Sequence, residues 1–374
     1  MSLSRKWMFA IAPAIGAGLL IAIDAAFGQQ PVGAKADETQ VLVSKAIDFL
    51  KTAQGKDGAF SAKFAGPGIT AIVVAGLVRN GVSPEEPVVA NALKFLEGKA
   101  QKDGGIYDKA LANYTTSVAI MAFKDANIKG RYDAVIKSAG EFIKKIQNDE
   151  EETHLNYGGF GYDKKSRPDM SNTGFSVEAL LAAGLSKDDP AVQRALKFIS
   201  RCQNLPGETN DQPFAKKTTD DDKGGLVYNP TPGEKNPHTT ATGGLRSVGG
   251  MTYSGLKSFL YAGVKKDDPR VKAAVTWVRN HYTLDENPGM GKAGLYYYYH
   301  TFAKAMDALG DDIFVDGKGA KHDWRRELFN ALQKQQLANG SWRNMGERTF
   351  GEDNAELATG FALLSLSYTK SPKR

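Results

Sequence analysis

The stretch Gln336-Leu337-Ala338-Asn339-Gly340-Ser341-Trp342 decides the fold, because related turns recur along the chain. Residues 54–60, Gln-Gly-Lys-Asp-Gly-Ala-Phe, repeat it with phenylalanine in place of tryptophan. Weaker copies, each with glycines shortly before an aromatic residue, lie at 103–107, 158–162 and 224–228. Glycines permit a tight reversal of the chain, and an aromatic ring can pack over the joint between two helices. These turns therefore mark the joints of a repeat.

Four residues of the two best copies have side chains that suit a structural role in such a joint. A glutamine amide, for example, can bond the loose backbone groups at a helix end. We interpret Gln54, Asp57, Gln336 and Trp342 as residues that hold the turns together, not as catalysts.

Two kinds of helical segment alternate around these turns. The first kind has one apolar stripe and one charged face, as expected of an outer layer. The second kind is apolar and hydroxyl-rich nearly all round, so it must be covered on most sides. The outer segments are residues 38–54, 86–100, 133–147, 190–203, 269–281 and 323–337. The inner segments are residues 68–79, 114–126, 172–184, 252–263, 294–309 and 354–368.

The inner segments also share a register. Counting back the same distance from the predicted helix ends reaches a threonine in four of them, namely Thr70, Thr116, Thr173 and Thr252. In the last inner segment, Thr359 stands in a Thr-Gly-Phe sequence, as Thr173 does. Similarity at a fixed period, here roughly fifty residues, indicates a repeat architecture.

Helical hairpins that each leave an apolar face uncovered can stack into an open solenoid or close on themselves. Here the hairpins are complete only if the first outer helix pairs with the last inner helix. We therefore predict an all-α fold over residues 38–370, an (α/α)6 toroid of six inner and six outer helices. Its inner helices would run parallel, with their N-termini gathered at one end.

The glycine-aromatic turns resemble those of the prenyltransferase and squalene oxidase repeat family, which includes triterpene cyclases and the β subunits of protein prenyltransferases. The resemblance covers roughly residues 40–370. It implies the toroid, with a ligand in its central cavity.

This sequence lacks the catalytic motifs of these relatives. Triterpene cyclases use a D-x-D-D aspartate, but the nearest run, residues 219–223, lacks the first aspartate. The zinc ligands of protein prenyltransferases have no counterpart, because residues 295–300 contain no cysteine and Ala358 stands near the histidine position. We expect no metal and no cofactor, and whether the chain is an enzyme stays open.

The N-terminal segment differs from the rest. Arg5 and Lys6 precede an apolar run from Trp7 to Phe27, and small residues stand in the −3 and −1 positions before Gln29. This order is typical of a secretory signal. We expect residues 1–28 to direct export to the periplasm or medium, or alternatively to remain as a membrane anchor.

The amino-acid composition excludes few classes of binding partner. The chain has 374 residues, 41% hydrophobic and 24% charged, with a formal net charge of +6 and both signs interspersed. A mildly basic surface suits an acidic glycan or lipid headgroup, and nothing indicates nucleic acid. A small-molecule ligand is equally possible, and a membrane contact is expected only through an uncleaved N-terminal segment. Cys202, the only cysteine, is predicted to be a buried residue without a disulfide.

Candidate site residues lie at or near the starts of the inner helices, where helix dipoles favour an anionic ligand. The run Tyr296-Tyr297-Tyr298-Tyr299-His300 covers every side of a helix, so some of its rings should face the cavity. His300 and tyrosine can act in proton transfer, although both can also simply fill the core. The candidate catalytic residues are His300, Tyr297 and Asp353. The candidate ligand-binding residues are Tyr162, Asp169, Asn172, Thr173, Tyr253 and Tyr296.

Charged residues interrupt the apolar inner helices. Glu178 and Lys257 hold equivalent positions in neighbouring units, and Lys304 lies in the next unit. Because buried charge is costly unless it is paired, we expect a Glu178–Lys257 bridge or an exposure to the cavity. The irregular insertion at about 204–250, which breaks the period, is a candidate lid over the mouth.

Three functions remain open. One is a non-catalytic protein that binds a ligand in the central cavity, and another is a terpene cyclase-like enzyme acting on a polyprenoid in an aromatic cavity. The third is a lyase or hydrolase for acidic polysaccharides.

Overall fold

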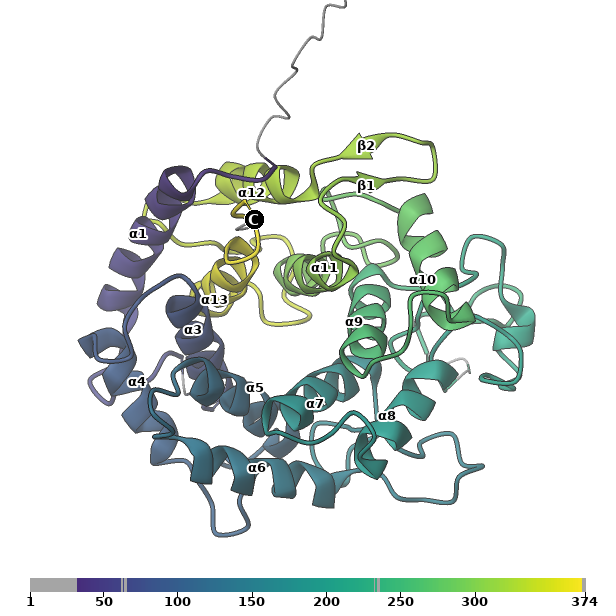
Figure 1. Ribbon diagram of the computed structural model, residues 1–374, viewed down its shortest axis with the longest axis horizontal. Helices are drawn as coiled ribbons and strands as arrows, with labels where there is room; N and C mark the ends of the chain where they lie inside the picture. The colour runs from purple at the N-terminus through teal and green to yellow at the C-terminus, as the bar shows by residue number, and fades with distance from the viewer. Residues whose placement is uncertain (1–31, 62, 64–65, 232, 234–235, 372–374) are drawn as a thin grey trace, which may run out of the picture. The chain divides into compact units, whose positions relative to one another are not determined.

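Alternating inner and outer α-helices make up most of the computed structural model, which describes residues 32–61, 63, 66–231, 233 and 236–371 (Figure 1). The outer helices are α1 (Ala36–Ala53), α4 (Pro87–Glu97), α6 (Asp133–Ile146), α8 (Pro190–Arg201), α10 (Pro269–Asn280) and α12 (Trp324–Gln335). The inner helices are α3 (Gly68–Arg79), α5 (Ala112–Asp125), α7 (Met170–Ala182), α9 (Gly249–Tyr261), α11 (Leu295–Leu309) and α13 (Ala355–Leu366). The predicted all-α class and the alternation of six outer with six inner helices are confirmed.

Two small elements complete the described part of the chain. A single 3-10 turn, η1 (Ala215–Lys217), lies in the irregular segment between α8 and α9. Strands β1 (Phe314–Val315) and β2 (Lys321–His322) pair antiparallel, with Phe314 opposite His322, and connect α11 to α12.

Burial separates the two layers as the sequence pattern predicts. In α3 every residue from Gly68 to Leu77 is buried. In α6, by contrast, the buried residues are confined to one stripe that includes Ile136, Phe142 and Ile143. An inner helix is thus covered by neighbours on most sides, whereas an outer helix covers the ring with one face.

The inner helices close into a ring (Figure 1). Each contacts the next in chain order from α3 to α13, and α13 contacts α3. Glycines allow this last contact: a Cβ added at Gly76 would lie 2.9 Å from the Leu363 Cβ, and one at Gly360 would lie 2.8 Å from the Ile72 Cγ2. Closure therefore depends on backbones that approach more closely than larger residues permit.

The two ends of the described chain seal the ring together, as the hairpin count predicts. Helix α1 packs against α13, and the Ala34 backbone N–H donates to the Thr369 carbonyl at 2.9 Å. The Arg326 guanidinium of α12 lies 2.8 Å from the Glu38 carboxylate of α1. The first outer helix is thus paired with the last inner helix.

The glycine-aromatic turns bond one hairpin to the next. The Gln336 amide donates to the Leu42 and Gly340 carbonyls at 2.9 Å, and the Gln54 amide donates to the Gly58 and Val88 carbonyls at 2.9 and 2.8 Å. The Asp57 carboxylate accepts from the Ala59 backbone N–H at 3.1 Å. Trp342 is fully buried, and its indole N–H donates to the Leu332 carbonyl at 2.8 Å. Gln147 and Gln203, which sequence reasoning missed, make the same pair of amide bonds in other units.

The threonine register also has a physical cause in these turns. In five units the threonine hydroxyl oxygen accepts a hydrogen bond from the backbone N–H of the residue two positions after a turn glycine of positive φ. The pairs are Phe60–Thr70, Ile106–Thr116, Phe160–Thr173, Leu226–Thr252 and Trp342–Thr359, at 2.8–3.0 Å. Five of the six inner helices described, all except α11, are therefore tied by the same bond to the turn that precedes them.

Candidate ligand cavity

A cavity of about 370 Å³ lies at the N-terminal ends of the inner helices. Each inner helix contributes a side chain to it, namely Ile69, Tyr114, Phe175, Met251, Tyr297 and Phe361. These residues lie in the first two turns of their helices, so the N-termini of the inner helices gather around the cavity as predicted.

Aromatic rings form a continuous part of the cavity wall. Tyr114 meets Phe175 edge-on at 5.5 Å between ring centroids, Phe175 lies 5.8 Å from Tyr297, and Tyr297 lies 5.9 Å from Phe361. Tyr228 and Phe350 add a further pair at 6.5 Å. Ring faces and edges of this kind suit apolar ligands, with tyrosine hydroxyls as polar ends.

Few charged groups face this cavity. Among the described residues that line it, Glu352 and Arg348 are charged. The Glu352 side chain is buried, and it accepts from the Tyr297 backbone N–H at 2.8 Å and from the Asn344 amide at 3.1 Å. Burial raises the pKa of Glu352 above its usual range. The Arg348 side chain is largely exposed and lies 3.6 Å from the Asp353 carboxylate.

The structure places Asp353 differently from its neighbour. Asp353 is half-buried and does not line the cavity, whereas Glu352, one residue earlier, does. The sequence analysis named Asp353, and not Glu352, as a candidate. The segment before α13 is irregular, so no helical period fixes which of two successive side chains points inward.

The start of α7 brings three of the candidate residues together. Asp169 caps the helix, because its carboxylate accepts from the Asn172 backbone N–H and from the Asn172 side-chain amide, both at 2.8 Å. Burial raises the pKa of Asp169 to about 6. Asn172 lines the cavity, whereas Thr173 is fully buried and donates to the Asp169 carbonyl at 2.7 Å.

The tyrosine side chains of α11 point in different directions. Tyr297 lines the cavity, and its hydroxyl accepts from Ser171 at 3.2 Å. Burial raises the pKa of Tyr297 to about 12. Tyr296 instead donates to the Gln335 side chain of α12 at 3.2 Å. Of the two candidates outside α11, Tyr162 lines the cavity, while Tyr253 packs against Phe302 with ring centroids 5.1 Å apart.

His300 lies outside this cavity. It lines a void of about 20 Å³ further along the ring axis, together with Glu178, Lys304 and Arg79. Its Nδ1 has no hydrogen-bond partner among the described residues, and burial lowers the pKa of its imidazole well below the usual range. Phe175 lines both spaces, so its ring stands between the aromatic cavity and His300.

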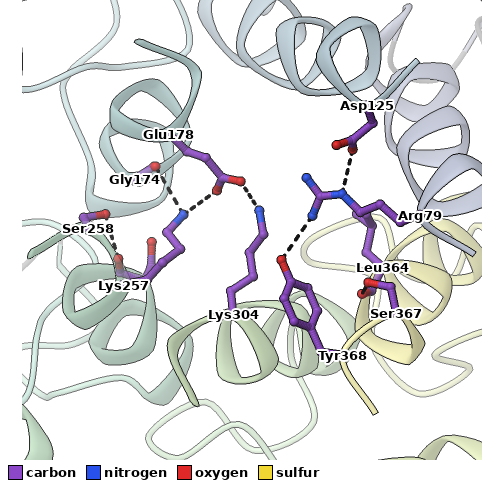
Figure 2. Close-up of polar contacts among 11 residues, drawn as sticks. Arg79, Asp125, Gly174, Glu178, Lys257, Ser258, Lys304, Leu364, Ser367 and Tyr368 are labelled. Carbon is purple, nitrogen blue, oxygen red and sulfur yellow. Dashed lines mark hydrogen bonds and ion pairs between the residues drawn. The ribbon is translucent and has the colours of Figure 1, made fainter. Parts of the chain in front are cut away.

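A charge network occupies the same region as the small void (Figure 2). The predicted bridge is present: the Lys257 Nζ lies 2.7 Å from the Glu178 carboxylate, which also pairs with Lys304. Arg79 lies 2.6 Å from the Asp125 carboxylate. Burial lowers the pKa of Lys304 to about 7, and the two ammonium groups hold the pKa of Glu178 well below its usual range against the effect of burial.

The irregular segment between α8 and α9 contributes little to the cavity. Of residues 204–250, only Tyr228 and Val248 line it among those described. Glu208, Thr209 and Asp211 line a separate outer groove of about 980 Å³ beside α8. Residues 348–352, just before α13, lie at the cavity instead of the predicted lid.

Several further features bear on the sequence predictions. Cys202 is buried and free, as expected. Within the described residues, no group of three or more His, Cys, Asp or Glu side chains is arranged to hold a metal ion. None of the described helices is long and apolar enough to cross a membrane. The predicted signal or anchor at 1–28 lies outside the described residues.

Comparison with solved structures gives distant similarities. The type II terpene cyclase MstE from Scytonema matches with 13% identity over 89% of this chain and 98% of its own, at a TM-score of 0.34. A variant of MstE in complex with geranylgeranyl dihydroxybenzoate matches with 14% identity and the same coverage and TM-score. The glucoamylase of Hormoconis resinae matches with 13% identity over 82% of this chain and 53% of its own, at a TM-score of 0.29. The fold is shown by this chain's own helices.

Comparison by sequence gives one family. No curated protein matches the chain. The model of the squalene-hopene cyclase C-terminal domain matches residues 64–219, a range that contains the first inner helices and two of the glycine-aromatic turns. The predicted resemblance to the squalene cyclase and prenyltransferase repeat family is thereby confirmed over residues 64–219, which are similar to that domain.

Proposed function

We propose that this protein binds an apolar small molecule of the isoprenoid class in the cavity at the N-terminal ends of the inner helices. The observation that carries the proposal is the wall of that cavity, which is built largely from aromatic and aliphatic side chains with few polar groups. Binding sites for small molecules are typically concave and mainly apolar, with a few polar groups that fix orientation. The similarity to the squalene-hopene cyclase domain supports the isoprenoid class.

The charge distribution argues against an acidic glycan in this cavity. Glu352 brings a buried carboxylate to the wall, and the lining cation Arg348 points largely into solvent. A polyanionic sugar would lose its hydration without gaining buried cations in exchange. The apolar wall would also leave most sugar hydroxyls without partners.

A titration with farnesol tests the proposal. We expect saturable binding, seen as a change in tyrosine and tryptophan fluorescence and confirmed by calorimetry. Met290 is half-buried at the cavity wall, so Met290→Trp should fill part of the space and weaken binding by about tenfold or more. The matched control is Met345→Trp, because Met345 is 69% exposed and does not line the cavity. Absent binding, or equal binding by both variants, would contradict the proposal.

A cyclase-like reaction is the second candidate, favoured by Glu352. Burial raises the pKa of the Glu352 carboxyl group, and the fraction of this group that holds a proton can act as an acid toward an alkene at the wall of the aromatic cavity. Aromatic faces such as those of Tyr297 and Phe361 can stabilise the cation that follows. Incubation with squalene and with farnesol derivatives, followed by gas chromatography, tests this. Turnover that is lost in Glu352→Gln while binding persists would support a reaction at Glu352, and turnover unchanged by this variant would exclude that residue.

We also propose that the chain is exported, because residues 1–28 have the charged, apolar and small-residue order of a secretory signal. Intact mass of the protein recovered after expression with its full leader tests this. A mature chain starting at Gln29 supports export with cleavage, and a full-length chain in the membrane fraction supports the anchor instead.

A further inference from the structure

Asn172, a residue that lines the cavity, holds a buried polar atom without a hydrogen-bond partner among the described residues. The residue lies in the first turn of α7, lines the cavity and is 2% exposed. Its amide nitrogen donates to the Asp169 Oδ2 at 2.8 Å. Its amide oxygen, Oδ1, has no donor among the described residues.

The orientation of this amide is fixed by its neighbour. The Asp169 Oδ1 already accepts from the Asn172 backbone N–H at 2.8 Å, so both carboxylate oxygens face Asn172. Turning the amide over would point its oxygen at a carboxylate, which only accepts hydrogen bonds when ionised. The nitrogen therefore faces Asp169, and the oxygen is left as an acceptor.

Two of the helix N-termini around the cavity, those of α7 and α11, already have an acidic side chain of the protein beside their partial positive charge. Asp169 caps α7, and Glu352 accepts from the Tyr297 backbone N–H at the start of α11. Both residues are at least 95% buried, being 4% and 1% exposed. A helix N-terminus that carries its own carboxylate is a poor site for a second anion, because the two negative charges repel.

Neutral hydroxyl groups supply further polar atoms of the wall, beside the Asn287 amide and the largely exposed Arg348 guanidinium. Burial raises the pKa of Tyr114, Tyr162, Tyr228 and Tyr297 above the usual range for tyrosine, so these phenols keep their protons at neutral pH. Such groups can meet an uncharged polar ligand atom. They offer little compensation for a diphosphate.

We propose that the ligand is a neutral isoprenoid alcohol, whose hydroxyl group donates to the Asn172 Oδ1 while its hydrocarbon chain lies against the aromatic wall. This inference rests on the proposed function and narrows it, because an isoprenoid diphosphate or a pure hydrocarbon would leave the acceptor unpaired. Sites built to bond a ligand hydroxyl discriminate strongly against analogues that lack it.

A matched series of ligands tests the inference on the unaltered protein. Farnesol, farnesyl methyl ether and farnesyl diphosphate share one chain and differ in the group at its end. We expect farnesol to bind about tenfold more tightly than the ether, which accepts but cannot donate, and more tightly than the diphosphate. Equal binding of alcohol and ether, or tighter binding of the diphosphate, would overturn the inference and leave isoprenoid binding intact. Failure of all three to bind would reject the proposed function itself.

A pair of variants then assigns the preference to one atom. In Asn172→Ala the difference between alcohol and ether should fall to about twofold or less. The control is Asn113→Ala, because Asn113 is buried on neighbouring α5 with its amide bonded to Gly161 and Ser176, and it does not line the cavity. This control should keep the preference, and circular dichroism verifies the fold of both. If folded Asn172→Ala still prefers the alcohol to the ether, another group of the protein recognises the ligand hydroxyl.

Discussion

The two ends of the inner-helix ring differ in what fills them. At the N-terminal end, aromatic and aliphatic side chains surround a cavity of about 370 Å³. Toward the other end, Glu178, Lys257, Lys304 and Arg79 fill the ring axis and leave a void of about 20 Å³ (Figure 2).

Parallel helices explain why the charges differ between the ends. The N-termini of α7 and α11 are partly positive and are met by the carboxylates of Asp169 and Glu352, whereas Arg79 is the last residue of α3, at a partly negative C-terminus. One end is thereby closed by paired charges, and the other keeps space for a ligand. The ring itself therefore does not make a pocket, because the side chains along its axis decide which end is hollow.

The largest effect should come from the filled end. Replacing Glu178 by Ala leaves Lys257 and Lys304 buried without their shared partner, which we expect to cost about 3–5 kcal/mol of unfolding free energy. Urea denaturation measures this. Glu152→Ala is the surface control, because its pair with Lys197 is exposed and should be worth nothing measurable. A small loss in Glu178→Ala would mean that the network does not seal this end.

A smaller loss is expected where the ring closes. In Gly360→Ala the new methyl group would press against Ile72, so we expect a cost of about 1–3 kcal/mol, measured by urea denaturation. Gly346→Ala is the control, because nothing lies within 4 Å of a Cβ built there. Equal stability of the two variants would show that α13 and α3 do not approach as closely as described.

The hollow end should respond to pH through Asp169. Burial raises its pKa to about 6 in the folded chain from the ordinary aspartate value of 3.8, so the folded state holds the proton more tightly than the unfolded state. This contribution is present at pH below about 4 and is lost as the pH rises through 6. The stability difference between wild type and Asp169→Asn should therefore change over this window, as denaturation at several pH values would show. A difference independent of pH would mean that Asp169 titrates normally.

The sequence predicts the ring better than it predicts the cavity, for a physical reason. Helical period and helix-end signals are local, so the sequence predicts the alternation of outer and inner helices. The threonine register also has a local cause, because each of these threonines bonds the turn that precedes its helix. The direction of a side chain within a fully buried helix is not local. In the tyrosine run of α11, Tyr297 faces the cavity while Tyr298 and Tyr299 bond the Thr283 and Leu284 carbonyls.

The directions of the polar candidate side chains could not be predicted from the sequence either, for the same reason. His300 has the proton-transfer chemistry that makes it a candidate, but it lies on the filled side of Phe175. Glu352 lies in an irregular segment where no period indicates its direction. Asn172 was identified because it stands at a helix start, although its unpaired oxygen is visible only once Asp169 is placed beside it.

The structure of the complex with farnesol tests the central claim most directly, because it shows which space the ligand occupies. We predict the ligand among Tyr114, Tyr297 and Phe361, within hydrogen-bond distance of Asn172, with the Glu178 network unchanged. A ligand located in the outer groove beside α8, or seated among the charges beyond Phe175, would contradict the account.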